Sequence, residues 1–121
     1  MFISTISDEF SFLVNSGFVE AAECCNEQYD RISWTRDDVR IVIENERYHY
    51  ALILSIYFQE KEIDVNKLFE AYDLPYRRKY EYPDKDRIGK AITYLKEAVE
   101  GFITKFTDDP EGMKAAFTDL I

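Results

Sequence analysis

The sequence predicts a single α+β domain: an N-terminal helix, a four-stranded antiparallel meander sheet, and two or three C-terminal helices packed on the sheet. Two observations predict this fold. Apolar residues recur at helical spacing at both ends of the chain, whereas residues 18–58 alternate between apolar and polar positions and are rich in β-branched and aromatic residues. The connections within that central region are short, which favours antiparallel neighbours. A chain of 121 residues has room for one core, so residues 1–121 form one domain.

The first helix occupies the residues before Gly17, which is typical of a helix end. Its apolar residues share a helical spacing: Phe2, Ile6, Phe10, Leu13 and Val14. Four strands follow, separated by polar residues typical of turns. Their expected ranges are 18–25, 28–35, 38–44 and 48–58.

The fourth strand is apolar on both faces. Tyr48, Leu52 and Phe58 lie on one side, and Ala51, Ile53 and Tyr57 lie on the other. A strand of this kind is central in its sheet, or its second face is covered by a helix or a partner. The pattern is the first indication of contact beyond the core.

Three helices are expected after the sheet. Asp64 can cap a short helix that ends before Pro75, and a loop follows to about Pro83. The longest helix spans about residues 86–106, with an apolar stripe that favours packing on the core over a coiled coil. Asp109-Pro110-Glu111 resembles the start of a final helix.

The net charge of −9 is concentrated at the ends of the chain, and residues 1–30 hold six acids with no Lys or Arg. A chain of this sign is a poor general binder of nucleic acid or of an anionic membrane, but it favours fast encounter with basic partners. No apolar run approaches the length of a membrane span, and the N-terminus lacks the pattern of a signal peptide. We therefore expect a cytoplasmic protein.

No pattern of catalytic, cofactor-binding or metal-binding residues is evident. His49 is the single histidine, and it could lie beside Cys24 or Cys25 only if the first and fourth strands were neighbours. The two cysteines are adjacent, so they encode neither a disulfide framework nor a zinc site. The four glycines are too dispersed for a phosphate-binding loop. We expect no enzyme, no cofactor and no metal, with a Cys/His or carboxylate-pair enzyme kept as the third alternative.

Three groups of residues are candidates for binding a partner. The segment 72–82 combines tyrosines with consecutive cations, which are residue types that anchor protein interfaces. The favoured interpretation is nevertheless a plain linker whose tyrosines fold back on the domain, and a contact for single-stranded nucleic acid is the least in keeping with the charge. The second group belongs to the strands, where Trp34 is either a core anchor or an exposed extension of the aromatic face. The third group is acidic. The candidates are Tyr72, Tyr76, Arg77, Arg78, Tyr80 and Tyr82 in the segment, Trp34, His49 and Tyr57 in the strands, and Glu20 and Glu23 in the acidic N-terminal third.

The overall layout resembles that of a known group of proteins. The features that carry the resemblance are Phe10-x-x-Leu13, Gly17-Phe18, Val39-x-Ile41-x-Ile43 and the long C-terminal helix. With these features the chain resembles the small acidic immunity proteins encoded beside bacterial polymorphic toxins. The resemblance covers most of the length at the level of pattern. It implies a bacterial, cytoplasmic protein that binds one basic toxin domain and blocks its active site with acidic and aromatic side chains.

A second class of protein has similar properties. Secretion chaperones are also small, acidic and α+β, and they act as homodimers that wrap an effector segment around an apolar sheet or groove. Their usual pattern places a helix between strands, whereas this sequence predicts four strands in a row. The expected function is therefore non-catalytic protein binding, with an immunity protein first and a chaperone-like dimer as the alternative.

Overall fold

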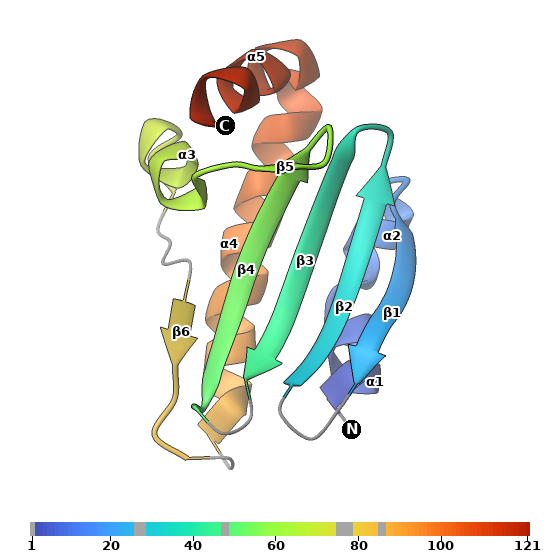
Figure 1. The fold of residues 1–121 in the computed structure, drawn as a ribbon, viewed down its shortest axis with the longest axis vertical. Coiled ribbons are helices and arrows are strands. Elements are labelled where there is room, and N and C mark those ends of the chain that lie inside the picture. The colour runs from blue at the N-terminus through green and yellow to red at the C-terminus, as the bar shows by residue number, and fades with distance from the viewer. Residues whose placement is uncertain (1, 26–28, 47–48, 75–78, 85–86) are drawn as a thin grey trace.

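The computed structural model describes residues 2–25, 29–46, 49–74, 79–84 and 87–121. It confirms the α+β prediction, with N-terminal helices, an antiparallel sheet and C-terminal helices packed on it (Figure 1). The helices are α1 (Phe2–Glu9), α2 (Ser11–Asn15), α3 (Val65–Ala71), α4 (Ile88–Asp108) and α5 (Pro110–Leu120). The strands are β1 (Val19–Cys25), β2 (Tyr29–Arg36), β3 (Val39–Glu46), β4 (Ala51–Phe58), β5 (Lys61–Glu62) and β6 (Lys79–Glu81).

The strands form a meander in the order β1-β2-β3-β4-β5, and β6 also pairs with β4. Every pairing is antiparallel. The predicted four strands are present, but β5 and β6 were not expected, and β6 lies in a segment interpreted as loop. These two strands have two and three residues, which is too short for an alternating pattern to show. They pair with opposite ends of the outer edge of β4, which would otherwise be unpaired there.

The N-terminal helix predicted before Gly17 is divided into α1 and α2 at Phe10, whose backbone (φ −106°, ψ 20°) leaves the helical region. Gly17 follows with φ +94°, a conformation that favours glycine. The helix starts agree with the sequence. Asp64 accepts a hydrogen bond from the Lys67 backbone N–H at 3.1 Å, and Asp109 accepts one from the Gly112 N–H at 3.0 Å.

The core lies between the helices and one face of the sheet. In Figure 1, α1, α2 and α4 lie behind the sheet, while α3 and α5 pack at one end of it. Trp34 is fully buried on that face, with its ring centroid 5.7 Å from that of Phe10. At the other end of the core, Phe117 of α5 packs on Phe58 and on Phe102 of α4.

No helix within the described residues is long and apolar enough to cross a membrane.

Candidate functional site

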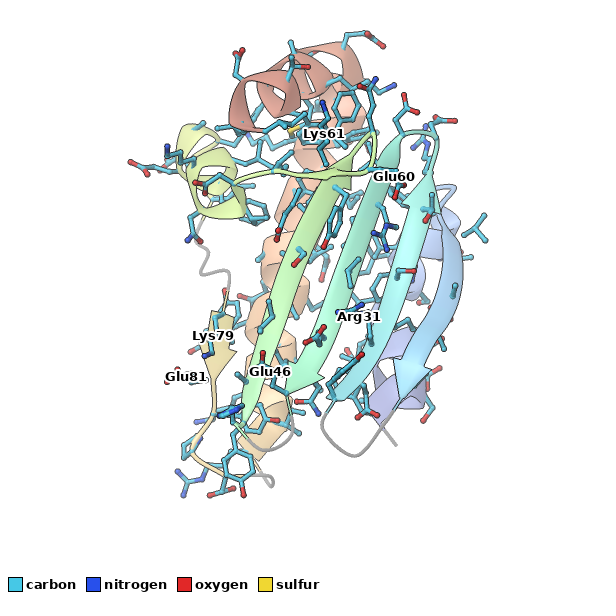
Figure 2. The ribbon with its side chains drawn as sticks, viewed as in Figure 1. Arg31, Glu46, Glu60, Lys61, Lys79 and Glu81 are labelled. Atoms are coloured by element: carbon cyan, nitrogen blue, oxygen red, sulfur yellow. The ribbon has the colours of Figure 1, made fainter. Side chains whose placement is uncertain are left out.

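The second face of the sheet carries no helix in the part of the chain that the structure describes (Figure 1). We call it the open face. The register of the strands defines its members: Tyr29, Arg31, Ser33 and Thr35 on β2, Arg40, Val42, Glu44 and Glu46 on β3, and Ala51, Ile53, Ser55 and Tyr57 on β4. Figure 2 shows Arg31 and Glu46 on this face, and Lys79 and Glu81 of β6 at its margin.

The open face is covered by its own long side chains. Ser33, Val42 and Ser55 form one row across three strands, and all three are buried although no helix lies above them. The long side chains of the neighbouring rows must therefore shield them from water. A partner would meet arginine, tyrosine and glutamate side chains first, with small residues beneath them.

Contacts among these long side chains hold them in place, and in one of them the Arg31 guanidinium lies 5.3 Å from the centroid of the Tyr29 ring. The Arg31 guanidinium donates through Nε (3.0 Å) and Nη2 to the same Oε2 atom of Glu44. The Arg40 guanidinium lies over the Tyr57 ring, 4.5 Å from its centroid. The ion pair is 39% and 19% exposed, so it contributes at most about 1 kcal/mol to stability, and the half-buried cation–π contact contributes about 0.5–2 kcal/mol. Their main effect is to order the side chains before any partner arrives.

The sequence predicts that the fourth strand is central in the sheet or has a covered second face, and its pairing agrees with a central position. β4 is paired along its whole length with β3 and at both ends with β5 or β6. No helix of the described ranges covers its second face. Tyr57 is half-buried there beneath Arg40, and His49 is exposed in the turn between β3 and β4.

The tyrosines of the segment 72–82 do not form one exposed loop. Tyr72 is half-buried and packs against the core after α3. Tyr80 lies on β6, half-buried, with its ring parallel to that of Tyr94 on α4 and a centroid distance of 6.3 Å. Tyr82 is buried. These three follow the linker interpretation, in which the tyrosines fold back on the domain. The remaining candidates of the segment, Tyr76, Arg77 and Arg78, lie outside the described residues.

Tyr82 belongs to a buried polar contact that the sequence did not reveal. Its hydroxyl donates to Oδ1 of Asn45 at 2.6 Å. Burial raises the pKa of the Tyr82 phenol, the Asn45 hydrogen bond opposes this, and the neighbouring Tyr50 and Asp30 raise it further. An asparagine facing the core near the end of β3 was the available signal, because a buried amide requires partners.

Trp34, a candidate of the strands, and Glu20, a candidate of the acidic N-terminal third, are joined in a contact of their own. Trp34 lies in the core, as its core-anchor interpretation holds, and its Nε1 donates to Oε1 of Glu20 at 3.0 Å. The other carboxylate oxygen of Glu20 accepts from the Ser7 hydroxyl at 2.7 Å. Glu20 thus has a structural role on the helix-covered side of β1, which leaves it poorly placed for a partner. The side chain of Glu23 lies outside the described part.

The strand order does not favour a thiol–imidazole pair. β2 and β3 separate β1, which carries Cys24 and Cys25, from β4, which follows the His49 turn. Three interstrand spacings of about 4.8 Å amount to about 14 Å. Among the described residues, no group of three or more His, Cys, Asp or Glu side chains could hold a metal ion.

Comparison with protein-family models, with curated proteins and with solved structures found no match to this chain.

Proposed function

We propose that this chain is a non-catalytic protein-binding module that contacts its partner through the open face. The observation that carries the proposal is a sheet covered by helices on one face, with an ordered layer of arginine and tyrosine side chains on the other. Arginine and tyrosine are enriched among the residues that dominate binding energy at protein interfaces. The open face presents Tyr29, Arg31, Arg40 and Tyr57 together.

The order of these side chains supports the same conclusion. Immobilising a rotamer-rich side chain on binding costs about 0.5–1.5 kcal/mol. Arg31 is already held by Glu44, and Arg40 already lies on Tyr57, so part of this cost is met in the free protein. The contacts that add little to stability therefore favour association.

Charge favours a basic partner. The chain carries −9, which raises the rate of encounter with a cationic protein at low ionic strength. Together with the resemblance to immunity proteins, this supports a bacterial protein that neutralises a cognate toxin by covering a basic active site. The candidate partner is the product of an adjacent toxin-like reading frame.

The first test is genetic and biochemical. A toxin-like reading frame should lie beside this gene, its expression should harm cells, and co-expression of this chain should restore growth. The two purified proteins should form a complex measurable by calorimetry, and the affinity should fall as salt increases. An isolated gene, or a neighbouring toxin that this chain neither binds nor neutralises, would contradict the proposal.

The second test locates the contact. Arg40→Ala with Tyr57→Ala removes the paired long side chains at one end of the open face, and we expect binding to weaken by about 30-fold or more, the effect of losing about 2 kcal/mol at an interface. Lys90→Ala with Tyr94→Ala is the matched control, because it also removes a cation and a tyrosine, from exposed positions on α4. Equal losses in both double variants would refute the assignment of the open face.

A further inference from the structure

The strand β1 forms an edge of the sheet (Figure 1). It pairs with β2 on its inner side, and no strand among the described residues pairs with its outer side. Alternate residues of an edge strand direct their N–H and C=O groups away from the sheet, where they can pair with another extended chain. The other edge of the meander, along β4, is occupied in part by β5 and β6.

The β1 edge has few of the features that usually prevent pairing. Natural edges are protected by lysine, proline, inward-pointing charges or bulges. The strand contains neither lysine nor proline, Val19 is 72% exposed, and Ala21 and Ala22 are exposed as well. Two such devices are present in the described part of this edge, the inward-pointing charge of Glu20 and a register shift between Ala22 and Cys24, and both leave the backbone of Val19–Ala22 available.

Charge decides which chain would pair there. Residues 1–30 contain six acids and no Lys or Arg, so a second copy would bring two acidic segments together. An extended segment with lysine or arginine would experience attraction instead. The carboxylate of Glu20 is held by Trp34 and Ser7 on the helix-covered side of β1, so it does not stand in the path of an added strand.

We propose that the outer edge of β1 binds an extended basic segment of the protein partner as an additional strand. This inference rests on the proposed protein-binding function and specifies one contact within it. Main-chain hydrogen bonds along Val19–Ala22 would provide affinity, and the negative charge of residues 1–30 would favour basic segments.

A peptide probe tests the edge without the partner. The probe is a capped synthetic peptide of alternating lysine and valine, added to the full chain labelled with ¹⁵N. We expect saturable shifts and slower amide hydrogen exchange within Val19–Ala22. A peptide with the same sequence and N-methyl groups on alternate backbone nitrogens carries the same charge but cannot complete the ladder, so we expect it to bind at least about tenfold more weakly. An alternating glutamate–valine peptide should not bind.

The opposite results would overturn the inference. Equal binding of the N-methylated peptide would show that charge alone attracts the probe, and shifts spread over other acidic regions would exclude the β1 edge. Ala21→Pro provides a second check in the protein, because proline removes a backbone N–H from the edge strand. Thr93→Ala is the control, since Thr93→Pro would break α4. If Ala21→Pro does not fold, the N-methylated peptide still decides the question.

The two proposals fail separately. A toxin partner that binds, depends on the open face and leaves the exchange of Val19–Ala22 unchanged would refute the added strand and retain the protein-binding function. A probe that pairs with β1 although the chain has no protein partner would retain the edge chemistry and refute the proposed function.

Discussion

Glu20→Ala should destabilise the fold through the single tryptophan. The carboxylate of Glu20 accepts from Trp34 Nε1 at 3.0 Å and from the Ser7 hydroxyl at 2.7 Å. Trp34 is fully buried, so its N–H would lose its partner at a cost of about 1–3 kcal/mol. Ser7 is half-buried and can turn to water, which limits its share to about 0.5 kcal/mol. The sum is about 2 kcal/mol, or a decrease of about 8 °C in Tm for a domain of this size.

Urea unfolding followed by tryptophan fluorescence measures this cost directly, because Trp34 is the only tryptophan. The control is a double-mutant cycle with Trp34→Phe, read by circular dichroism, in which Glu20→Ala should cost much less because no indole N–H remains. Glu20→Gln should lie between wild type and alanine, since its amide oxygen can still accept from Trp34. A cost below about 0.5 kcal/mol in the wild type, or the same cost in the Trp34→Phe background, would refute the assigned role of Glu20.

Two further predictions concern the Tyr82–Asn45 hydrogen bond and the glycines of α4. Tyr82→Phe removes the donor to Asn45 and should cost about 1–2 kcal/mol in urea unfolding. The pKa of Tyr82 is raised in the fold above its ordinary value of 10.0. The stability that this shift contributes is therefore fully present below pH 10.0 and is lost as the pH rises through the folded pKa. Tyr82→Phe should accordingly lose less stability at alkaline pH than the wild type. Gly89→Ala in α4 meets open space and should stabilise by up to about 1 kcal/mol, whereas Gly101→Ala places its Cβ 3.0 Å from Leu74 Cδ2 and should gain less. Adding Leu74→Ala should release that difference, and an equal gain for both alanines in the wild type would contradict the close contact.

The main elements could be predicted from the sequence because each has a clear period or end signal. The alternation of Val39, Ile41 and Ile43 identifies the central strand, and Asp64 and Asp109 mark the helix starts where the structure has them. Short elements give no period, which is why β5 and β6 were missed. The described tyrosines fold back on the domain as the linker interpretation expects, but sequence alone does not show that β6 brings Tyr80 onto α4 or that Tyr82 reaches Asn45 of β3.

The sequence predicts only part of the open face. The two-sided pattern of the fourth strand predicts an unusual second face, and Tyr57 was correctly placed on it. The layer that covers this face was not predictable, because it depends on which residues of β2, β3 and β4 stand opposite one another. Arg31 meets Glu44 across 13 positions of sequence, and Glu20 meets Trp34 across 14. Such pairs follow from register, and one residue of slip would reverse their faces.

The register also connects the two proposed contacts. Val19 stands opposite Thr35 and Ala21 opposite Ser33, so both belong to rows that continue across the open face. A strand added to β1 would extend these rows, and every second side chain of the added strand would lie beside Val19 or Ala21 on the same side of the sheet. A partner that uses both contacts should therefore lose binding energy additively when the edge and the Arg40–Tyr57 pair are altered together, because the two lie on strands separated by β2. If altering the β1 edge alone also removed the binding energy of the Arg40–Tyr57 pair, the partner's strand would have to bind the edge first and then order the open face.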